Sequence, residues 1–298
     1  MVKNDINKKQ NNEDILLFLF AQRKLYSISK RIFHIIFFVN LLFYILGLFS
    51  TVQSNNYFIA IYILWVIAIC LLQIKVSEQI NIAATMQELI DRKLYGFNIY
   101  TPFLNELKLR KRALKLKEKY SKEFIKQISR DGKQGGVKDW YSDVSGVPIE
   151  RAIILCQIEN NEWENQLRRK YQYFNIFLLI IFVLIYIVIF WNNSVENLII
   201  NMYPILPILI DRLSYIYRNH NNIEKGENIN RSLDYIYENI KELTKEDVLN
   251  KAKEIQHCIY DRRKYFSPIP NLFYDFNRSK YQSYSNKYIS DLKKKLKS

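Results

Sequence analysis

Two long stretches of this chain carry almost no charge. Positions 32–74 contain no Lys, Arg, Asp or Glu, and positions 171–210 contain only Glu196. A helix that crosses the hydrocarbon core of a bilayer needs about 20 mostly apolar residues. A water-soluble core rarely requires an apolar run of that length, so the distribution of charge predicts a membrane protein.

Each stretch divides into two apolar segments separated by a short polar link. Segments 32–51 and 57–74 predict a first transmembrane hairpin at 32–74. A second hairpin at 172–217 combines segment 172–191 with a shorter one that reaches membrane length only by extending through Asp211 to Tyr217. The expected fold class is all-α, a membrane protein with four transmembrane helices in two hairpins and a helical cytoplasmic domain.

The positions of Lys and Arg predict the orientation of these spans. Basic residues precede the first and third spans and follow the second and fourth, and neither link contains one. Cytoplasmic loops carry the excess of Lys and Arg, so both termini and the middle region are expected in the cytoplasm. The expected segments are an amphipathic N-terminal helix at 1–31, hairpins at 32–74 and 172–217, a basic helical region with a central turn at 75–171, and a C-terminal helical region at 218–298.

Three local signals predict where cytoplasmic helices begin and end. Pro148 suits the first position of a helix that continues into the third span, because it needs no N–H partner there. Residues 244–247, Thr-Lys-Glu-Asp, resemble a capping box that opens a later helix. The Ser-Pro-Ile-Pro sequence at 267–270 is expected to end that helix.

The sequence lacks the usual signatures of catalysis and metal binding. Gly132-Lys133-Gln-Gly-Gly136 does not match a phosphate-binding loop, and His34, His220 and His257 form no ligand pattern. The three cysteines are scattered, which gives no disulfide framework. Neither an enzyme nor a cofactor or metal site is expected.

The chain is strongly basic, with 44 Lys and Arg against 29 Asp and Glu and a formal net charge of +15. Such a balance favours an anionic partner, namely membrane head groups or nucleotides. The basic segment 108–126 fits three interpretations: contact with an anionic leaflet, contact with a nucleotide, or a solvated helix face. No DNA or RNA polymer is expected as a partner.

Polar residues in or near the spans are candidates for a pore or gate. Asp211 and Arg212 lie where the fourth span nears the cytoplasm, and they either face the bundle interior or extend to the head groups. Pro204 and Pro207 are expected to kink this span. His34, Asn40 and Asn201 either line a pore or hydrogen-bond neighbouring helices.

The order of spans and motifs resembles the SMODS-associated four-transmembrane pore-forming effector family of bacterial CBASS-type anti-phage systems. Three stretches carry this resemblance: Asn12-Glu13 with Leu16 and 21–27 (Ala-Gln-Arg-Lys-Leu-Tyr-Ser), then 138–142 (Lys-Asp-Trp-Tyr-Ser) with 154–157 and 163–169, and finally 267–271 (Ser-Pro-Ile-Pro-Asn) with Tyr274 and Arg278. They span nearly the whole chain.

The resemblance implies a membrane effector beside a synthase that makes a cyclic oligonucleotide on infection. The nucleotide would switch the effector to form pores or disrupt the bacterial inner membrane, and the cell would stop growing or die. A homo-oligomer is expected, because two hairpins enclose a pore poorly. The alternative is a membrane-anchored helical interaction or scaffold protein without pore activity.

A nucleotide ligand needs cations for its phosphates and aromatic rings for its bases. The turn after position 131 brings both kinds of residue together near a helix start. The candidate ligand-binding residues are Lys133, Lys138, Trp140, Tyr141 and Arg151. The alternative is that Trp140 and Tyr141 are buried anchors that hold the turn onto the inner domain.

Overall fold

The computed structural model describes residues 4–49, 55–130, 135–192, 194–195, 202–265 and 267–297. Within these ranges the chain consists of helices and their connections, without a β-strand, which confirms the expected all-α class. The elements are α1 (Ile6–Lys9), α2 (Glu13–Leu46), α4 (Asn56–Tyr95), α5 (Glu106–Lys119), α6 (Ser121–Ile128), α7 (Ile149–Ile189), the 3-10 turn η1 (Tyr203–Ile205), α9 (Leu206–Glu238), α10 (Lys245–Lys264) and α11 (Asn271–Lys297).

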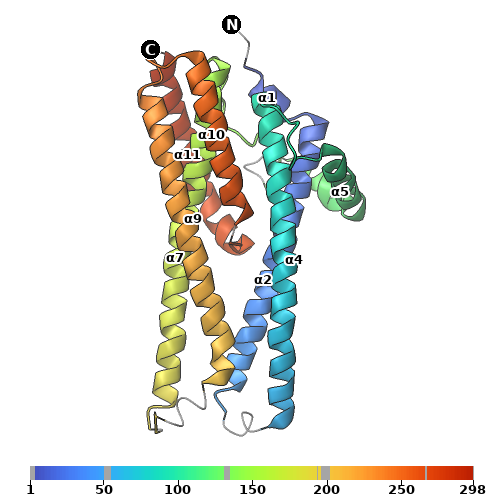
Figure 1. Cartoon of the computed structure of the whole chain (residues 1–298), viewed down its shortest axis with the longest axis vertical. Helices are drawn as coiled ribbons and strands as arrows, with labels where there is room; N and C mark the ends of the chain where they lie inside the picture. The colour runs from blue at the N-terminus through green and yellow to red at the C-terminus, as the bar shows by residue number, and fades with distance from the viewer. Residues whose placement is uncertain are drawn as a thin grey trace.

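Two long antiparallel helix pairs form the body of the molecule. Helix α2 packs along α4, and α7 packs along α9. Figure 1 shows that the chain reverses within each pair at the same end of the molecule, whereas both termini, α5, α10 and α11 lie toward the other end. This arrangement separates an elongated, helix-only part from a broader part in which additional helices are packed.

Three helices are long and apolar enough to cross a membrane: α2, α4 and α7. None of the 18 residues in the most apolar window of α4 is buried, so the apolar side chains there point away from the protein. A surface of this kind is stable only against lipid or another apolar partner. The fourth predicted span begins at 197–201, outside the described residues, and its remainder forms the beginning of α9.

Each of the three long helices continues from the apolar region into the broader end. Helix α7 begins directly after Pro148 and runs unbroken to Ile189, as the sequence predicted for the third span. Helix α2 is continuous across position 31, so the junction expected between the N-terminal segment and the first span falls inside one helix. The membrane part and the broader part therefore share rigid elements.

Local signals define the helix ends. The Asn55 side chain accepts hydrogen bonds from the backbone N–H groups of Tyr57 and Phe58, at 2.9 and 3.3 Å, and so caps α4. Gly96 ends α4 in the left-handed conformation, with φ of 74°. The Thr244 hydroxyl accepts from the N–H of Asp247 at 3.2 Å, which confirms the predicted start of α10.

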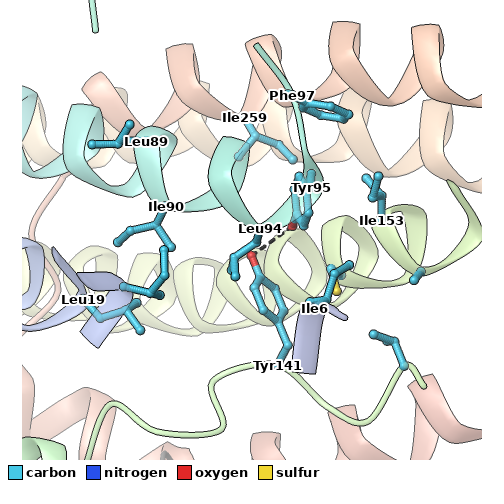
Figure 2. Close-up of a cluster of buried hydrophobic side chains, with 14 of the residues drawn as sticks. Ile6, Leu19, Leu89, Ile90, Leu94, Tyr95, Phe97, Tyr141, Ile153 and Ile259 are labelled. Carbon is cyan, nitrogen blue, oxygen red and sulfur yellow. Dashed lines mark hydrogen bonds between the residues drawn. The ribbon is translucent and has the colours of Figure 1, made fainter. Parts of the chain in front are cut away.

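The main hydrophobic core lies at the broader end, where α1, α2, α4, α7, α9, α10 and α11 meet. Figure 2 shows part of it, with Leu94 and Tyr95 of α4 beside Ile153 of α7 and Ile6 of α1. A smaller core within the membrane part joins Tyr44 of α2 to Phe182 of α7. The Tyr44 hydroxyl also donates to the Phe182 carbonyl at 2.8 Å, which links the two hairpins.

Gly226 allows α9 to approach α7 closely around a buried arginine. A Cβ at this position would lie 2.1 Å from Asn165 Oδ1 and 2.6 Å from Arg262 Cζ. Arg262 of α10 is nearly fully buried between these helices and donates to Asn222 Oδ1 at 2.8 Å and to Asn165 Oδ1 at 2.5 Å. Only glycine leaves room for this arrangement.

We expect Gly226→Ala to destabilise the protein, because the added methyl group displaces Arg262 or Asn165 from the positions in which they hydrogen-bond to each other. Overpacking of this kind costs about 1–3 kcal/mol. Thermal unfolding of the purified protein should show a lower midpoint than the native chain. Ser232→Ala on the exposed side of the same helix is the control, with a change within about 0.5 kcal/mol. Equal midpoints for the two variants would contradict the close approach.

Candidate functional site

A cavity lies at the broader end of the molecule, near the point where the chain turns from α10 to α11. It is partly open and has a volume of about 360 Å³. Its walls come from α2, α7, the connection before Pro148 and the start of α11. A volume of this size is within the range of small-molecule sites, about 300–1,000 Å³.

The lining combines rings, cations, acids and amides. The aromatic residues are Tyr26, Trp140, Trp163 and Tyr274. The charged residues are Arg23, Lys30, Arg263, Glu123, Glu159, Glu164 and Asp275. The amides are Gln22, Gln87, Gln127, Asn160 and Asn271. Ser27, Ser285, Leu167 and Ile269 complete the surface.

Two cations of α2, two helical turns apart, line this cavity. Arg23 Nη1 donates to the carbonyl oxygens of Gly135 and Gly136 at 2.8 and 2.9 Å, which fixes the connection against α2. Lys30 Nζ donates to Asn271 Oδ1 at 2.9 Å and lies 5.4 Å from the centre of the Tyr274 ring. The two side chains thus join α2 to both other sides of the cavity.

Lys30 lies in an environment that disfavours its positive charge. Burial, together with the nearby Arg23, lowers the pKa of Lys30 to about 8, although Asp275 opposes the shift. The ammonium group therefore has too little compensating negative charge. An anion bound beside Lys30 and Arg23 would relieve this imbalance.

The acids of the lining are largely compensated by groups behind them. Burial raises the pKa of Glu164, but Arg262 and Arg168 outweigh it and lower the value to about 2. Burial raises the pKa of Glu159, against hydrogen bonds from Ser142 and Ser285 that lower it. Glu164 and Glu159 thus have partners of their own, as does the lining cation Arg263, which pairs with Asp91 Oδ2 at 2.6 Å.

The aromatic residues form part of the cavity wall. The Trp163 and Tyr274 rings are 4.8 Å apart, edge to face, and belong to a cluster that joins α7 to α11. Trp140 is half-buried and packs against the main core. Ring faces of this kind are suitable for stacking with a nucleobase.

Of the predicted ligand-binding residues, Trp140 lines this cavity. Lys138 is exposed outside it, and Arg151 donates to the Leu296 carbonyl oxygen of α11 at 2.8 Å. Lys133 lies outside the described residues. These candidates thus do not converge on one site in the described part of the chain.

Tyr141 is a buried anchor, the alternative that the sequence left open. Its hydroxyl donates to Asp91 Oδ1 at 2.8 Å and accepts from Asn160 Nδ2 at 2.7 Å. Figure 2 shows this hydroxyl pointing toward Tyr95, whose own hydroxyl is 2.9 Å away. The ring is surrounded by core residues and is not available for stacking with a ligand.

The sequence analysis did not single out Arg23, Lys30, Trp163, Asn271 or Tyr274 as ligand-binding residues. A signal for four of them was nevertheless present, because all but Lys30 fall within the three stretches that carry the family resemblance. Those stretches lie far apart in the sequence and meet at this cavity. Lys30 carried no such signal and is identified only by its position.

The predicted gate pair is buried in the membrane part. Arg212 is 2% and Asp211 5% exposed, so both face the interior of the bundle instead of extending to the head groups. Arg212 Nη2 lies 2.5 Å from Asp211 Oδ2, and Nη1 donates to Asn175 Oδ1 at 2.8 Å. The guanidinium also lies 4.8 Å from the centre of the Phe37 ring. The pair therefore joins α9 to both α7 and α2.

The other pore candidates occupy different places. Asn40 is buried and accepts from Trp65 Nε1 at 2.8 Å, so it bonds a neighbouring helix. His34 is half-exposed, and Asn201 lies outside the described residues. Pro204 lies in η1 and Pro207 in the first turn of α9, so the prolines begin this helix and the kink predicted within the span does not occur.

A row of polar contacts connects the cavity wall with the buried pair. Glu164 of the wall accepts from Arg168 Nε at 2.8 Å, and Arg168 Nη1 donates to Asn219 Oδ1 at 3.0 Å. Asn219 then donates to Gln172 Oε1 at 2.7 Å. Gln172 lies one helical turn before Asn175, the partner of Arg212, on the side of α7 that faces α9.

Comparison with known proteins identifies one family. The model of the SMODS-associating 4TM effector domain matches residues 4–292, nearly the whole chain. No curated protein and no solved structure matches. The match includes the four-span hairpin arrangement and all three stretches that line the cavity.

We expect Tyr141→Phe to lower stability, because it removes the hydroxyl that links Asp91, Tyr95 and Asn160. A buried polar group left without its partner costs about 1–3 kcal/mol. The thermal unfolding midpoint of the purified protein measures this loss. Tyr100→Phe changes a residue that is 89% exposed and should leave the midpoint unchanged. A Tyr141→Phe protein as stable as the native chain would contradict the buried network.

Proposed function

The chain belongs to the SMODS-associating 4TM effector family, and we propose that it is a membrane effector of bacterial anti-phage defence that a cyclic oligonucleotide activates. In this proposal the nucleotide binds in the cavity between α2, α7 and α11. Binding switches a homo-oligomer in the inner membrane to a leaking state, which arrests or kills the infected cell.

The observation that carries the proposal is the convergence of three distant stretches on one cavity. Arg23 and Tyr26 come from the first stretch, Trp140 and Trp163 from the second, and Tyr274 from the third. The cavity is the place where a shared ligand would contact all three.

The lining suits the chemistry of a cyclic oligonucleotide. Arg23 and Lys30 supply positive charge for phosphodiester groups, and the lowered pKa of Lys30 indicates that an anion would be stabilised there. Trp163 and Tyr274 supply ring faces for a base. The side-chain amides around them can donate to and accept from base edges.

The contact row along α7 and α9 gives the cavity a route to the membrane. Its members, from Glu164 through Arg168 and Asn219 to Gln172, lie between two packed helices. A ligand that moves Glu164 or α11 changes the partners of Arg168 first. We propose that this change reaches Asp211 and Arg212, the buried pair in the apolar region.

The proposed arrangement in the membrane rests on the exposed apolar side chains of α4 and on the positions of Lys and Arg. In this proposal the outward-facing apolar side chains on α4 contact lipid, and both termini and the cavity lie in the cytoplasm, which the Lys and Arg pattern favours. A cytoplasmic nucleotide then has access to the cavity. Four helices enclose little space at their centre, so a pore requires several copies of the chain.

Dye efflux from liposomes that contain the purified protein tests the proposal. Efflux should be low without ligand and should rise with one member of a panel of cyclic di- and trinucleotides. Intact vesicles with every ligand, with insertion verified by protease protection, would favour the alternative of a membrane-anchored interaction protein.

Lys30→Gln should weaken the response to the active nucleotide about tenfold or more, because the cavity loses a desolvated cation near the phosphates. The amide can still donate to Asn271, which limits structural damage. The measurement is the nucleotide concentration that gives half-maximal efflux. Lys241→Gln removes an exposed charge after α9 and should leave that concentration unchanged. An unchanged value for Lys30→Gln would place the ligand elsewhere.

Asp211→Asn should raise efflux without ligand, because Arg212 loses the partner that holds it between α2, α7 and α9. Removing one member of a buried pair costs about 3–5 kcal/mol. The double variant Asp211→Leu with Arg212→Leu leaves no unpaired charge and should insert normally, also with raised efflux.

The control for this experiment is Glu224→Gln, an exposed acid on the same helix. It should leave efflux at the native level. If the double variant inserts and stays closed without ligand, as the native protein does, the pair supports packing and does not hold the closed state.

A further inference from the structure

A second cavity lies at the edge of the outward-facing apolar surface. It has a volume of about 260 Å³ and is bounded by α2, α4, α9 and the connection after α10. On α4 the run of exposed apolar side chains ends at Ile74, and on α9 it ends at Tyr217. The cavity begins at this level, with Gln73 and Val76 on one side and Arg218 on the other.

The walls of this cavity are apolar toward the membrane part. Phe33 and Ile36 of α2 lie opposite Val76 and Ile80 of α4, and all four side chains line the cavity. They adjoin the exposed apolar surface of α4, so an acyl chain can enter from the lipid phase without crossing water. A polar ligand alone would leave these walls without a suitable partner.

The rim of the cavity is cationic. Arg218, Lys225 and Lys264 line it, and none of the described residues that line it is acidic. Lys264 is 2.6 Å from Asp261 Oδ1, so part of its charge is already compensated. Arg218 and Lys225 are both exposed and lie two turns apart on the same face of α9.

We propose that this cavity binds the phosphodiester head group of an anionic phospholipid of the inner leaflet. Arg218 and Lys225 contact the phosphate, and the first part of an acyl chain packs on the Phe33 and Val76 walls. Basic pockets between membrane helices on the cytoplasmic side recognise anionic lipids in this way. The proposal requires only that the chain is in a membrane, and it does not depend on gating by a nucleotide.

A phosphodiester also occurs in a cyclic oligonucleotide, so the ligand source has to be distinguished. The apolar walls favour the lipid, because Phe33, Ile36, Val76 and Ile80 form an apolar side toward the membrane part, whereas the first cavity offers several ring faces for bases. A lipid head group is held by its acyl chains as well as by its charge. A soluble fragment with the same phosphodiester should therefore bind much more weakly.

Native mass spectrometry of the full-length protein can measure binding of a first phosphatidylglycerol molecule against phosphatidylcholine with the same acyl chains. The native protein should prefer phosphatidylglycerol. The double variant Arg218→Gln with Lys225→Gln should bind it about tenfold more weakly or worse, since each basic residue near an anionic lipid surface contributes independently. The preference over phosphatidylcholine should then disappear.

A matched control removes two exposed cations elsewhere. Lys245→Gln with Lys253→Gln on α10 changes the net charge equally and should leave lipid affinity within twofold. Thermal unfolding of both double variants verifies that they are folded. Undiminished binding of phosphatidylglycerol by the Arg218 and Lys225 variant would overturn the proposal.

Competition distinguishes the sources of the phosphodiester. Glycerophosphoglycerol, the deacylated head group, and a cyclic dinucleotide are each added to the lipid-bound native protein. Neither compound should displace the lipid when it is added at a concentration near the dissociation constant of the lipid. Displacement by either at such a concentration would show a soluble-ligand site and overturn the assignment to lipid.

Discussion

Four buried arginines determine how the helices of this protein pack. Arg168, Arg212, Arg262 and Arg263 are each at most 4% exposed, and a buried guanidinium is stable only when it is hydrogen-bonded and compensated. Their partners lie on different helices, so each arginine fixes the position of one helix against another. The packing of α7, α9 and α10 depends on satisfying these groups together.

The partners differ along the axis of the molecule. In the membrane part Arg212 has a carboxylate, whereas Arg262 at the broader end is bound mainly by the side-chain amides of Asn165 and Asn222. Burial lowers the pKa of Arg262 to about 10, against the raising effect of Glu164. A neutral amide oxygen stabilises a guanidinium less strongly than a carboxylate does. Arg262 is therefore easier to displace than Arg212, whereas Arg263 beside it is held by Asp91 Oδ2 at 2.6 Å.

Much of the fold was predictable because its signals are local. The length of the apolar runs predicted the spans, and Pro148 and Thr244 predicted helix starts. The two links without Lys or Arg predicted hairpins that reverse at the same end of the molecule. The site was less predictable because it is made by contacts across the chain. The Tyr141 N–H, for example, donates to Gln10 Oε1 at 2.9 Å and so holds this residue against the core. The two residues are 131 positions apart, so a local sequence pattern does not reveal the contact. The prolines were misplaced for a related reason, since only the helix start decides whether a proline kinks or caps.

The short connection at 267–270 gives the two cavities a common wall. Ser267 and Pro268 line the cavity at the membrane edge, whereas Ile269 lines the first cavity, followed by Asn271. The Ser267 carbonyl also accepts from Arg168 Nη1 at 3.3 Å, which attaches this connection to the contact row between α7 and α9. A ligand in either cavity thus acts on the same few residues.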